Sequence, residues 1–547
     1  MRLLNVFSVN VLLMGILFST ANAVEFTKEP TIKKNPNPKV PLAAVVHFSA
    51  DRPAETKIQV SDGEHTWTLN YDISRKPSEG LPVIGMRPST THSLRVTIAD
   101  PKNGESKTAA VLHYTTPPLP EDALAFPQIK VLTADKERME PGLTIFNPRR
   151  RIPPNRVSAE ERRKMNQQFG MLTAVDADGH VVWYYNGDSR ISDFKLLSNG
   201  HILFLTQDYS AVEIDRLGNT VREWYAKHRP QGKKDGAIAV DALTFHHAIE
   251  ELPNGNFLVL STERKKIKNY YTSAYDKDAP RQEQWVMGDV ILEFEPSGKV
   301  VWRWNAFEHL DPFHIGYETF RGYWKRRGFP DTIDWSHANN LDPHFEDNFL
   351  LINFRYLSAV LKIERPSGAI QWIAGGQPGK WGELSEKCLS LKNDRRWFWH
   401  QHAAHITKNN RLLLFDNGNY QAEPFEKPVP RAQTRSRVME YKMDEKNQAL
   451  SAVWSSEHSN EEPVVSFAMG SAQLLPTTGN ILAGYGFVLH EDDLDKEILS
   501  ARTWTLIREF THTKPAQVVW ELTLKNRDPD SPVSWTLYGA RRIQALP

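Results

Sequence analysis

A hairpin that recurs along the chain, with a tryptophan in each copy, most limits the folds open to this sequence. Each copy is an apolar strand, a turn and a second apolar strand, as in AVDADGHVVWYY (174–185) and TLIREFTHTKPAQVVWEL (505–522). The tryptophans of the six copies are Trp183, Trp224, Trp302, Trp372, Trp454 and Trp520. They account for six of the 16 tryptophans in a chain of 547 residues. Self-similar units at such a spacing predict a repeat architecture.

A second element, made of an apolar strand, a turn and another apolar strand, alternates with the hairpin. Its copies lie at 193–206, 248–261, 341–353, 404–416 and 472–486. One hairpin plus one such pair makes a four-stranded unit, which is the blade of a β-propeller. No stretch shows the sustained periodicity of a helix. The sequence therefore predicts an all-β protein built on a six-bladed β-propeller. A large array of β-sandwiches is the alternative, and the alternation of the two elements disfavours it.

The residues before the repeat predict a smaller domain. Short apolar runs at 43–50, 56–60, 66–71, 92–99 and 107–115 are separated by clusters of Asp, Gly, Pro and Asn. Strands at this spacing are typical of a β-sandwich. The run PPLP (117–120) is typical of a linker. We expect an N-terminal β-sandwich domain at 24–118 and the propeller domain at 119–547.

The N-terminus predicts export from the cytoplasm. Arg2 precedes VLLMGILF (11–18), which is too short to span a bilayer, and small residues end at Ala23. We expect residues 1–23 to be a signal peptide and the protein to be periplasmic. No later segment approaches the roughly 20 apolar residues of a membrane helix, so no membrane partner is expected. With 67 Lys and Arg against 66 Asp and Glu, no nucleic-acid surface is expected.

The turn of each second element marks one matched position on the strand before it. Eight residues before the turn, or ten in the third unit, the chain carries Ser192, His247, His337, His402 and Ser471. In a propeller the inner strands line the central channel, where ligands bind. Three blades therefore bring a histidine to the same place around one axis. The repeat was defined without these histidines, so their agreement is informative.

Three explanations compete for these histidines. They bridge waters as polar channel residues, they form a metal site of three histidines, or they line an anion pocket with a histidine nucleophile or acid/base. Asn339 follows His337 by two residues and shares its face if the strand alternates regularly. Arg355 ends the next strand, and its guanidinium suits a tetrahedral oxyanion better than a bound cation. These neighbours favour the anion pocket.

The matched position also distinguishes the three histidines of the segment WFWHQHAAH (397–405) from one another. His402 holds the matched position, and alternation puts His400 on its face. In the second unit alternation turns His246 away from His247. We expect His246, His400 and His405 to be ordinary packing or surface residues.

Three segments together resemble the bacterial PAPS-independent aryl sulfotransferase family. They are FHHAIEELPNGN (245–256), DWSHANNLD with LLINFR (334–355), and WHQHAAH with LLLFDNGN (399–419). GSAQLLPTTGN (470–480) fits the same family, and the resemblance covers nearly the whole chain. It implies an arylsulfate sulfotransferase with a ping-pong mechanism, an aryl sulfate donor and a phenolic acceptor. It also implies a homodimer that uses no cofactor and no metal.

The resemblance assigns roles by matching motifs. His402 matches the nucleophile that becomes sulfated at nitrogen, and His247, His337, Asn339 and Arg355 match the groups that surround the sulfuryl oxygens. Among these, His337 is our candidate for the acid/base that serves the leaving phenolate and the acceptor phenol, and His247 is the other candidate. A transferring sulfuryl group spreads negative charge over its oxygens, so positioned donors suit it.

One feature departs from the family. Some members carry a disulfide near the nucleophile, whereas Cys388 is the single cysteine here, most simply a buried thiol. Two other functions use the same histidines and stay open at this point. One is a metal-dependent propeller hydrolase or lactonase, and the other is a non-catalytic propeller that binds an anion.

Overall fold

The computed structural model describes residues 24–152, 157–376, 378–393, 396–458, 464–528 and 533–546. The predicted signal peptide, residues 1–23, lies outside the described residues. The chain divides into two compact units. The first holds the residues up to Lys33 with Val45–Val83 and Thr91–Thr115, and the second holds Lys34–Ala44, Ile84–Thr90 and Thr116–Pro547.

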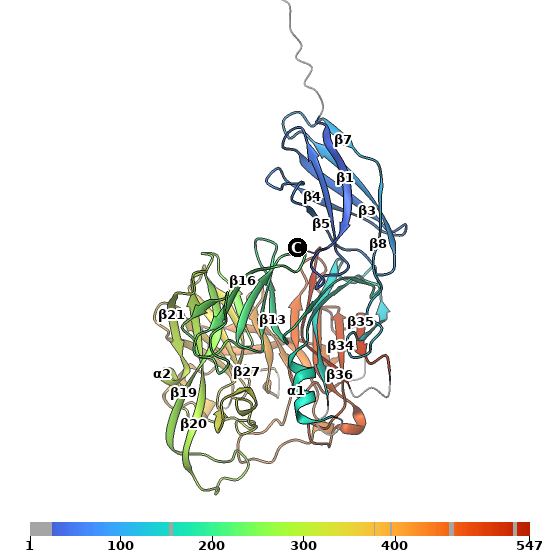
Figure 1. Cartoon of the computed structure of the whole chain (residues 1–547). Helices are drawn as coiled ribbons and strands as arrows, with labels where there is room; N and C mark the ends of the chain where they lie inside the picture. The colour runs from blue at the N-terminus through green and yellow to red at the C-terminus, as the bar shows by residue number, and fades with distance from the viewer. Residues whose placement is uncertain are drawn as a thin grey trace, which may run out of the picture. The chain divides into compact units, whose positions relative to one another are not determined.

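The first unit contains two small sheets, drawn in blue in Figure 1. One has the order β1-β2-β5 and the other β4-β3-β6-β7, with β8 paired to β6. The bounds are β1 (Phe26–Lys34), β2 (Ala44–Ala50), β3 (Glu55–Ser61), β4 (Thr66–Tyr71), β5 (Leu81–Val83), β6 (Thr91–Ala99), β7 (Ser106–Thr108) and β8 (Leu112–Thr115). Burial alternates along β3 and β6, as in a sheet with one face on a core. The β-sandwich is confirmed, although the run 107–115 forms two strands instead of one.

The second unit contains six sheets, which are the six blades of the predicted propeller. We name the blades A to F. Blade A consists of β13 (Ile191–Leu196), β14 (Ile202–Thr206), β15 (Ser210–Ile214), β16 (Thr220–Ala226) and β17 (Ile238–Val240). Blade B consists of β18 (Ile249–Glu251), β19 (Phe257–Tyr270), β20 (Gln282–Phe294) and β21 (Val300–Asn305), with β22 (Thr332–Asp334) beside β20, and blade C consists of β23 (Ala338–His344), β24 (Phe349–Phe354), β25 (Ala359–Glu364) and β26 (Ile370–Gly375).

Blades D to F complete the ring. Blade D consists of β28 (His402–Ile406), β29 (Arg411–Asp416), β30 (Arg437–Asp444), β31 (Ala449–Ser455) and β27 (Ser390–Lys392). Blade E consists of β32 (Ser471–Leu474), β33 (Ile481–Leu489), β34 (Thr503–Phe510), β35 (Val518–Lys525) and β9 (Gln128–Ala134). Blade F consists of β36 (Ser534–Ile543), β10 (Leu143–Arg151), β11 (Gly170–Val175) and β12 (Val181–Gly187). All five predicted second elements lie on the first two strands of a blade.

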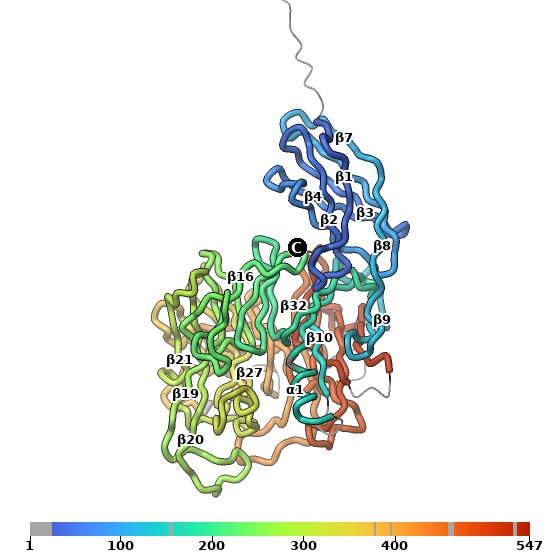
Figure 2. Tube along the Cα trace, viewed as in Figure 1, coloured from blue at the N-terminus to red at the C-terminus, as the bar shows by residue number. Residues whose placement is uncertain are grey.

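Both ends of the propeller unit contribute strands to the last two blades. In blade F the late strand β36 pairs antiparallel with β10, and in blade E the early strand β9 pairs antiparallel with β35. Figure 2 shows the cyan tube of β9 and β10 among the red tube of the C-terminal strands. The sixth inner strand pair is therefore not continuous in sequence, which explains why the repeat shows only five second elements.

The repeated tryptophans link neighbouring blades. In each blade one indole Nε1 donates a hydrogen bond to the hairpin turn of the next blade. The six bonds are Trp183 to Arg216 O (3.2 Å), Trp224 to Pro296 O (2.9 Å), Trp304 to Gly368 O (3.0 Å), Trp372 to Glu445 Oε1 (3.2 Å), Trp454 to Thr513 O (3.1 Å) and Trp520 to Ala177 O (2.8 Å). Followed in order, they return to the blade they started from.

The third of these tryptophans corrects the sequence analysis. Trp302 was assigned to the repeat, but Trp304, two residues further on, is the buried residue that donates to the next blade. Trp302 is only half-buried and lies under the guanidinium of Arg365. Residues that are two positions apart on a strand point to the same face, so the sequence alone does not tell Trp302 from Trp304.

Helices are few in the described part of the chain. The longest is α1 (Ala159–Gln167), whose N-terminus has a capping box between Ser158 and Glu161. The segment between β21 and β22 holds α2 (Ala306–His309) and continues through 310–331 without a strand. None of the helices in the described ranges has the length and apolar character needed to cross a membrane.

We predict that Trp224→Ala lowers the free energy of unfolding by about 3–5 kcal/mol, because it empties a fully buried site and removes the bond to Pro296. Chemical denaturation followed by circular dichroism measures the change. Val221→Ala is the matched control on the same strand, since Val221 is 45% exposed, and it should change stability by less than about 1 kcal/mol. Equal effects of the two changes would contradict a linking role for the indole.

Candidate active site

A cavity of about 480 Å³ in the propeller unit collects the matched positions of four blades. Ser192, His247, His337 and His402 line it, and Arg355 joins them from the end of β24. The rings of His247 and His337 pack edge to face with centroids 4.8 Å apart. Each histidine stands at or just before the first residues of an inner strand: β18, β23 or β28. The fold thus brings three histidines from three blades to one site.

The backbone at these histidines departs from regular strand geometry. His247 has φ 56° and His337 has φ 52°, both in the left-handed region, and Ala403, next to His402, has φ 55°. A left-handed residue breaks the alternation of side chains along a strand. His246 therefore does not face away: its Nδ1 lies 2.8 Å from Nδ1 of His247, and it also lines the cavity. The prediction for His246 was wrong for this reason.

The surroundings of His402 determine where its proton lies. Nδ2 of Asn417 donates to the carbonyls of Ser466 and Met469, at 2.8 and 2.9 Å, so Oδ1 of Asn417 faces the imidazole. That oxygen only accepts, and it lies 2.6 Å from His402 Nδ1, which must carry the proton. Nε2 then holds a lone pair and accepts from the N–H of Met469 at 3.2 Å. Burial, with the charge of Arg355, holds the pKa of His402 well below its usual range.

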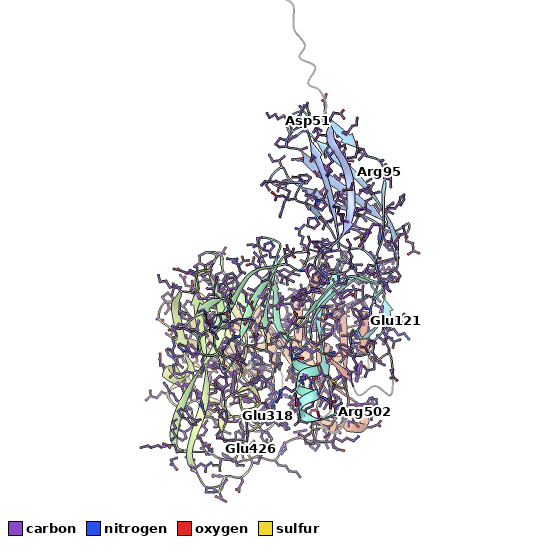
Figure 3. The ribbon with its side chains drawn as sticks, viewed as in Figure 1. Asp51, Arg95, Glu121, Glu318, Glu426 and Arg502 are labelled. Carbon is purple, nitrogen blue, oxygen red and sulfur yellow. The ribbon has the colours of Figure 1, made fainter. Side chains whose placement is uncertain are left out.

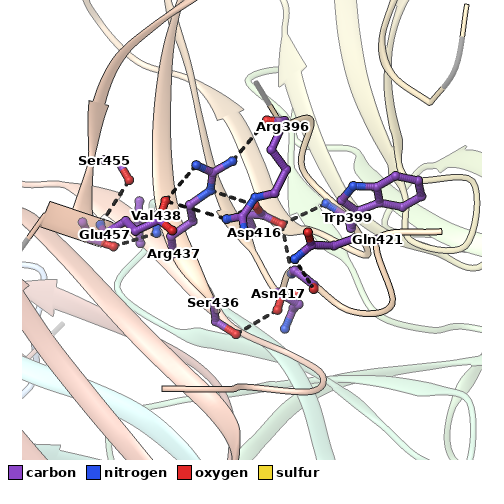
Figure 4. A network of polar contacts seen from close by, with 12 residues as sticks. Arg396, Trp399, Asp416, Asn417, Gln421, Ser436, Arg437, Val438, Ser455 and Glu457 are labelled. Atoms are coloured by element: carbon purple, nitrogen blue, oxygen red, sulfur yellow. Dashed lines mark hydrogen bonds and ion pairs between the residues drawn. The ribbon is translucent and has the colours of Figure 1, made fainter. Parts of the chain in front are cut away.

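A buried polar network behind Asn417 keeps it in place (Figure 4). The carboxylate of Asp416 accepts from the backbone N–H of Trp399 at 2.8 Å and from Nε of Arg437 at 3.0 Å. The hydroxyl of Ser436 donates to the carbonyl of Asn417 at 2.9 Å. Because these groups fix both flanks of the residue, the Asn417 amide presents a rigid acceptor to His402.

His247 is oriented by a similar chain of hydrogen bonds. Nε2 of His246 lies 3.0 Å from the carbonyl of Ser261, so this nitrogen carries the proton, and burial lowers the pKa of His246 to about 4. The remaining Nδ1 of His246 accepts from Nδ1–H of His247. The hydroxyl of Tyr323 lies 3.4 Å from the unprotonated Nε2 of His247. Burial, followed by the charge of His337, holds the pKa of His247 well below its usual range.

His337 is held by a carboxylate instead of an amide. Its Nδ1 lies 2.5 Å from Oδ2 of Asp334, and the other oxygen of Asp334 accepts from the indole of Trp324 at 2.9 Å. The imidazole stacks on Tyr356 with centroids 4.5 Å apart. A carboxylate at Nδ1 stabilises an imidazolium, so Nε2 of His337 is suited to give and take a proton.

Arg355 lines the cavity, and its charge is balanced by Glu318, which lines the same cavity and is labelled in Figure 3. Glu318 is buried and forms ion pairs with Arg355 and with Arg321, the latter at 2.7 Å, while Nδ1 of His400 lies 3.3 Å away. Burial opposes the charge on Glu318, yet Arg355 and His400 outweigh it and hold its pKa well below the usual range. Tyr420 adds a hydrogen bond at 3.2 Å.

Asn339 lies beside the histidines without facing the same cavity. Its Nδ2 donates to the carbonyl of Gln401 at 2.9 Å, its Oδ1 accepts from Asn353, and it lines a second, smaller cavity together with His402. The left-handed His337 explains why alternation does not carry Asn339 to the same side. The structure therefore places Asn339 where it supports the strand of His402 through Gln401.

Two other predicted residues lie away from the cavity lining. His405 hydrogen-bonds through Nδ1 to the carbonyl of Ala403 at 3.0 Å. Cys388 is a free thiol whose Sγ lies 3.8 Å from the carbonyl of Leu384, and burial raises its pKa to about 11. Neither group is placed to react with a ligand in the cavity.

Cationic and aromatic side chains dominate the rest of the lining. Seven arginines and two glutamates contribute: Arg149, Arg151, Arg190, Arg321, Arg326, Arg327, Arg355, Glu318 and Glu497. Tyr209, Phe245, Tyr323, Tyr356, Phe467, Phe487 and Tyr538 supply aromatic surface. A neutral histidine, cationic donors and aromatic walls suit an anionic group attached to an aromatic ring.

Several of these residues were missed by the sequence analysis, some with a usable signal. Arg355 follows LLINF and Asn417 follows LLLFD, so the reasoning that selected Arg355 also selects Asn417. Asp334 lies three residues before His337 and was left unused. Glu318 and Tyr323 lie in the segment between β21 and β22, which has no counterpart in other blades, so the repeat gave no signal for them.

Known proteins match most of the chain. The family model of arylsulfotransferase (ASST) matches residues 128–531, and that of the arylsulfotransferase Ig-like domain matches residues 31–117. An arylsulfate sulfotransferase AssT of Lelliottia amnigena is 21% identical over 503 residues, 77% of this chain and 78% of that protein. One of Escherichia coli O6:H1 is 24% identical over 338 residues, 51% of each chain. BamB from Moraxella catarrhalis aligns with a TM-score of 0.23 and 10% identity, over 58% of this chain and 76% of that one.

We predict that Glu318→Gln destabilises the protein by about 3–5 kcal/mol, because it leaves the buried Arg355 unpaired. The lowered pKa of Glu318 means that its contribution is complete above its ordinary value of 4.5 and is lost as the pH falls below it. Denaturation curves of parent and variant should therefore differ at pH 7 and converge in acid.

Glu283→Gln is the matched control, since it removes a carboxylate from an exposed pair with Lys266. This change should leave the stability almost unchanged, because exposed ion pairs contribute little. A Glu318→Gln variant as stable as this control at pH 7 would show that Glu318 does not balance the site.

Proposed function

The chain belongs to the arylsulfotransferase family, and on that premise we propose that it moves a sulfuryl group from an aryl sulfate to a phenol through sulfated His402. The observation that carries the proposal is the proton position on His402. Nδ1–H is held by Asn417, so the lone pair lies on Nε2, within the cavity. A neutral imidazole with an unprotonated nitrogen is a competent nucleophile near neutral pH. The donor is the aryl sulfate itself, so no PAPS is involved.

In the first half-reaction Nε2 of His402 attacks the sulfur and the bond from sulfur to the aryl oxygen breaks. The product on the protein is an N-sulfated imidazolium, whose charge the Asn417 acceptor stabilises. The attack displaces the hydrogen bond from the Met469 N–H, which becomes free to donate to a sulfuryl oxygen. His337, backed by Asp334, gives its Nε2 proton to the departing phenolate.

In the second half-reaction an acceptor phenol takes the place of the released one. His337, now unprotonated at Nε2, removes the phenol proton while the phenol oxygen attacks the sulfur and the sulfur–nitrogen bond breaks. His402 returns to its starting tautomer. His247 also presents an unprotonated Nε2 and is the second candidate for this base. Arg355, oriented by Glu318, stabilises the negative charge on the sulfuryl oxygens.

The charge of the cavity supports sulfuryl transfer over metal-dependent hydrolysis with the same histidines. Within the described ranges, one group of three metal-type side chains has ligand atoms within 4.8 Å of one another, and it is Asp176, Asp178 and His180. These residues belong to the turn between β11 and β12, so they are not the channel histidines. The arginines of the lining favour an anion.

The proposal includes the cell compartment and the assembly that the family resemblance implies. Residues 1–23 act as a signal peptide that directs the protein to the periplasm, and the working form is a homodimer. A single free cysteine makes the mature chain independent of an oxidase for an intrachain disulfide.

We predict that protein quenched after mixing with 4-nitrophenyl sulfate and no acceptor carries the mass of one added SO3 group on the peptide containing His402. His402→Ala should lack the adduct and should abolish the release of 4-nitrophenol. Peptide mass analysis and absorbance measure the two effects. The adduct should disappear when a phenol is added before the quench.

His405→Ala is the control, because His405 lies on the same strand but does not line the cavity. It should form the adduct at the parent's rate. Turnover retained in His402→Ala would contradict the nucleophile. A stoichiometric transition metal, lost together with activity on chelation, would favour the hydrolase, and sulfate binding without turnover would favour the anion-binding propeller.

We also predict that His337→Ala slows turnover of phenyl sulfate by about 100-fold or more, because the phenolate then leaves without a proton. The same change should slow 4-nitrophenyl sulfate much less, since 4-nitrophenolate leaves readily unprotonated. Initial rates of the two donors with one common acceptor give the comparison. If both donors lose the same factor, the proton donor is not His337, and the His247→Ala variant then tests the other candidate.

A further inference from the structure

Three arginines on one side of the cavity lack a carboxylate partner. Among the carboxylates that the structure describes, none forms an ion pair with Arg149, Arg190 or Arg327. The two glutamates of the lining are engaged elsewhere: Glu318 pairs with Arg355 and Arg321, and the charge of Glu497 acts on Arg151. Arg149 is buried, and Arg190 and Arg327 are half-buried. Unpaired guanidinium groups that are removed from water are costly unless a ligand supplies the negative charge.

The hydrogen bonds of these arginines leave much of their capacity unused. Arg149 is 7% exposed and donates to the carbonyl of Ile191 at 2.7 Å and to Sδ of Met469 at 3.2 Å. Nε of Arg190 is buried without a hydrogen-bond partner. Arg327 donates to the carbonyl of Tyr323 at 3.2 Å. Burial, with the like charges of Arg149 and Arg327 nearby, holds the pKa of Arg190 well below its usual range.

Aromatic rings separate these arginines from the catalytic histidines. The guanidinium of Arg149 lies over Tyr538 at 4.6 Å, and the Tyr538 hydroxyl donates to the carbonyl of His247. The guanidinium of Arg327 lies over Tyr323 at 3.6 Å, and Tyr323 stacks on His247. Tyr538 and Tyr323 therefore each contact His247 on one side and one of these arginines on the other.

We propose that Arg149, Arg190 and Arg327 form a subsite for a second anionic group on the aromatic substrate, such as a carboxylate, sulfate or phosphate. The substrate class is then an aryl sulfate that carries a further negative charge on its ring or side chain. Its sulfate ester lies against His402, its ring lies between Tyr323 and Tyr538, and its second anion lies against the arginines. This inference rests on the proposed function for the sulfate end alone.

Kinetics of matched donors test the subsite. Phenyl sulfate is compared with its 3- and 4-carboxyphenyl analogues in the parent and in Arg190→Gln, at one fixed ionic strength because salt screens such contacts. The ratio of kcat/KM for the carboxylated donor to kcat/KM for phenyl sulfate should fall about tenfold in the variant, as expected for the loss of a charge-assisted contact. Differences between the leaving groups cancel, because each donor is compared with itself across the proteins.

Arg281→Gln is the matched control, since it removes an exposed arginine that stacks on a tyrosine, Tyr271, as Arg327 stacks on Tyr323. The ratio should stay at the parent's value there. Arg327→Gln provides an independent second variant in case Arg190→Gln folds poorly. A ratio within about twofold of the parent's in both subsite variants overturns the proposal.

Binding measurements keep this test separate from the proposed function. Calorimetry with the unreactive 4-carboxybenzenesulfonate and with benzenesulfonate should show about tenfold tighter binding of the dianion to the parent, and this preference should be lost in Arg190→Gln. Equal affinities in the parent overturn the subsite, even if turnover of phenyl sulfate is normal. Preference for the dianion without any turnover supports the subsite and contradicts the transferase. Inorganic sulfate bound as tightly as the dianion, and weakened by Arg190→Gln, reassigns the arginines to a free anion and also overturns the proposal.

Discussion

Closure of the ring of six blades is the constraint on which the rest of the structure depends. His247, His337 and His402 come from three different blades, so the site exists only when blades B, C and D hold fixed positions around the axis. The six indole hydrogen bonds pass from each blade to the next, and the pairing of β36 with β10 joins the ends. The whole ring therefore fixes the positions of a few side chains in the cavity.

Burial does two different things at the site. At His402 and His247 it keeps the imidazoles neutral, and acceptors fixed by neighbouring residues decide which nitrogen keeps the lone pair. At the arginines it cannot remove the charge, so each guanidinium needs an anion from somewhere. Glu318 meets that need for Arg355, and nothing in the described chain meets it for Arg190. This contrast distinguishes the charge-balanced part of the cavity at Arg355 from the part where guanidinium groups have no carboxylate partner.

Much of the fold and part of the site could be predicted because the repeated strands and turns are visible in the sequence as a regular pattern of apolar and turn residues. Six sheets and the matched places of His247, His337 and His402 follow from that pattern. The sixth inner strand pair was invisible, because its strands come from opposite ends of the unit. His246 and Asn339 were assigned to faces by an alternation that left-handed residues interrupt. Glu318 comes from a segment that has no counterpart in the other blades, so the repeat could not predict where its side chain would lie.

The pairing of β36 with β10 also sets the order in which this molecule can assemble. Arg542 and Thr144 meet across that sheet although they lie 398 positions apart along the chain. A contact of such sequence separation forms late, since the loop that it closes is long. Until Ser534–Ile543 is available, β10 has an unpaired edge of backbone N–H and C=O groups, which invites pairing with another chain. Pairing with β36 covers this edge of β10, so the closing strand removes a place at which an incomplete chain can pair with another chain.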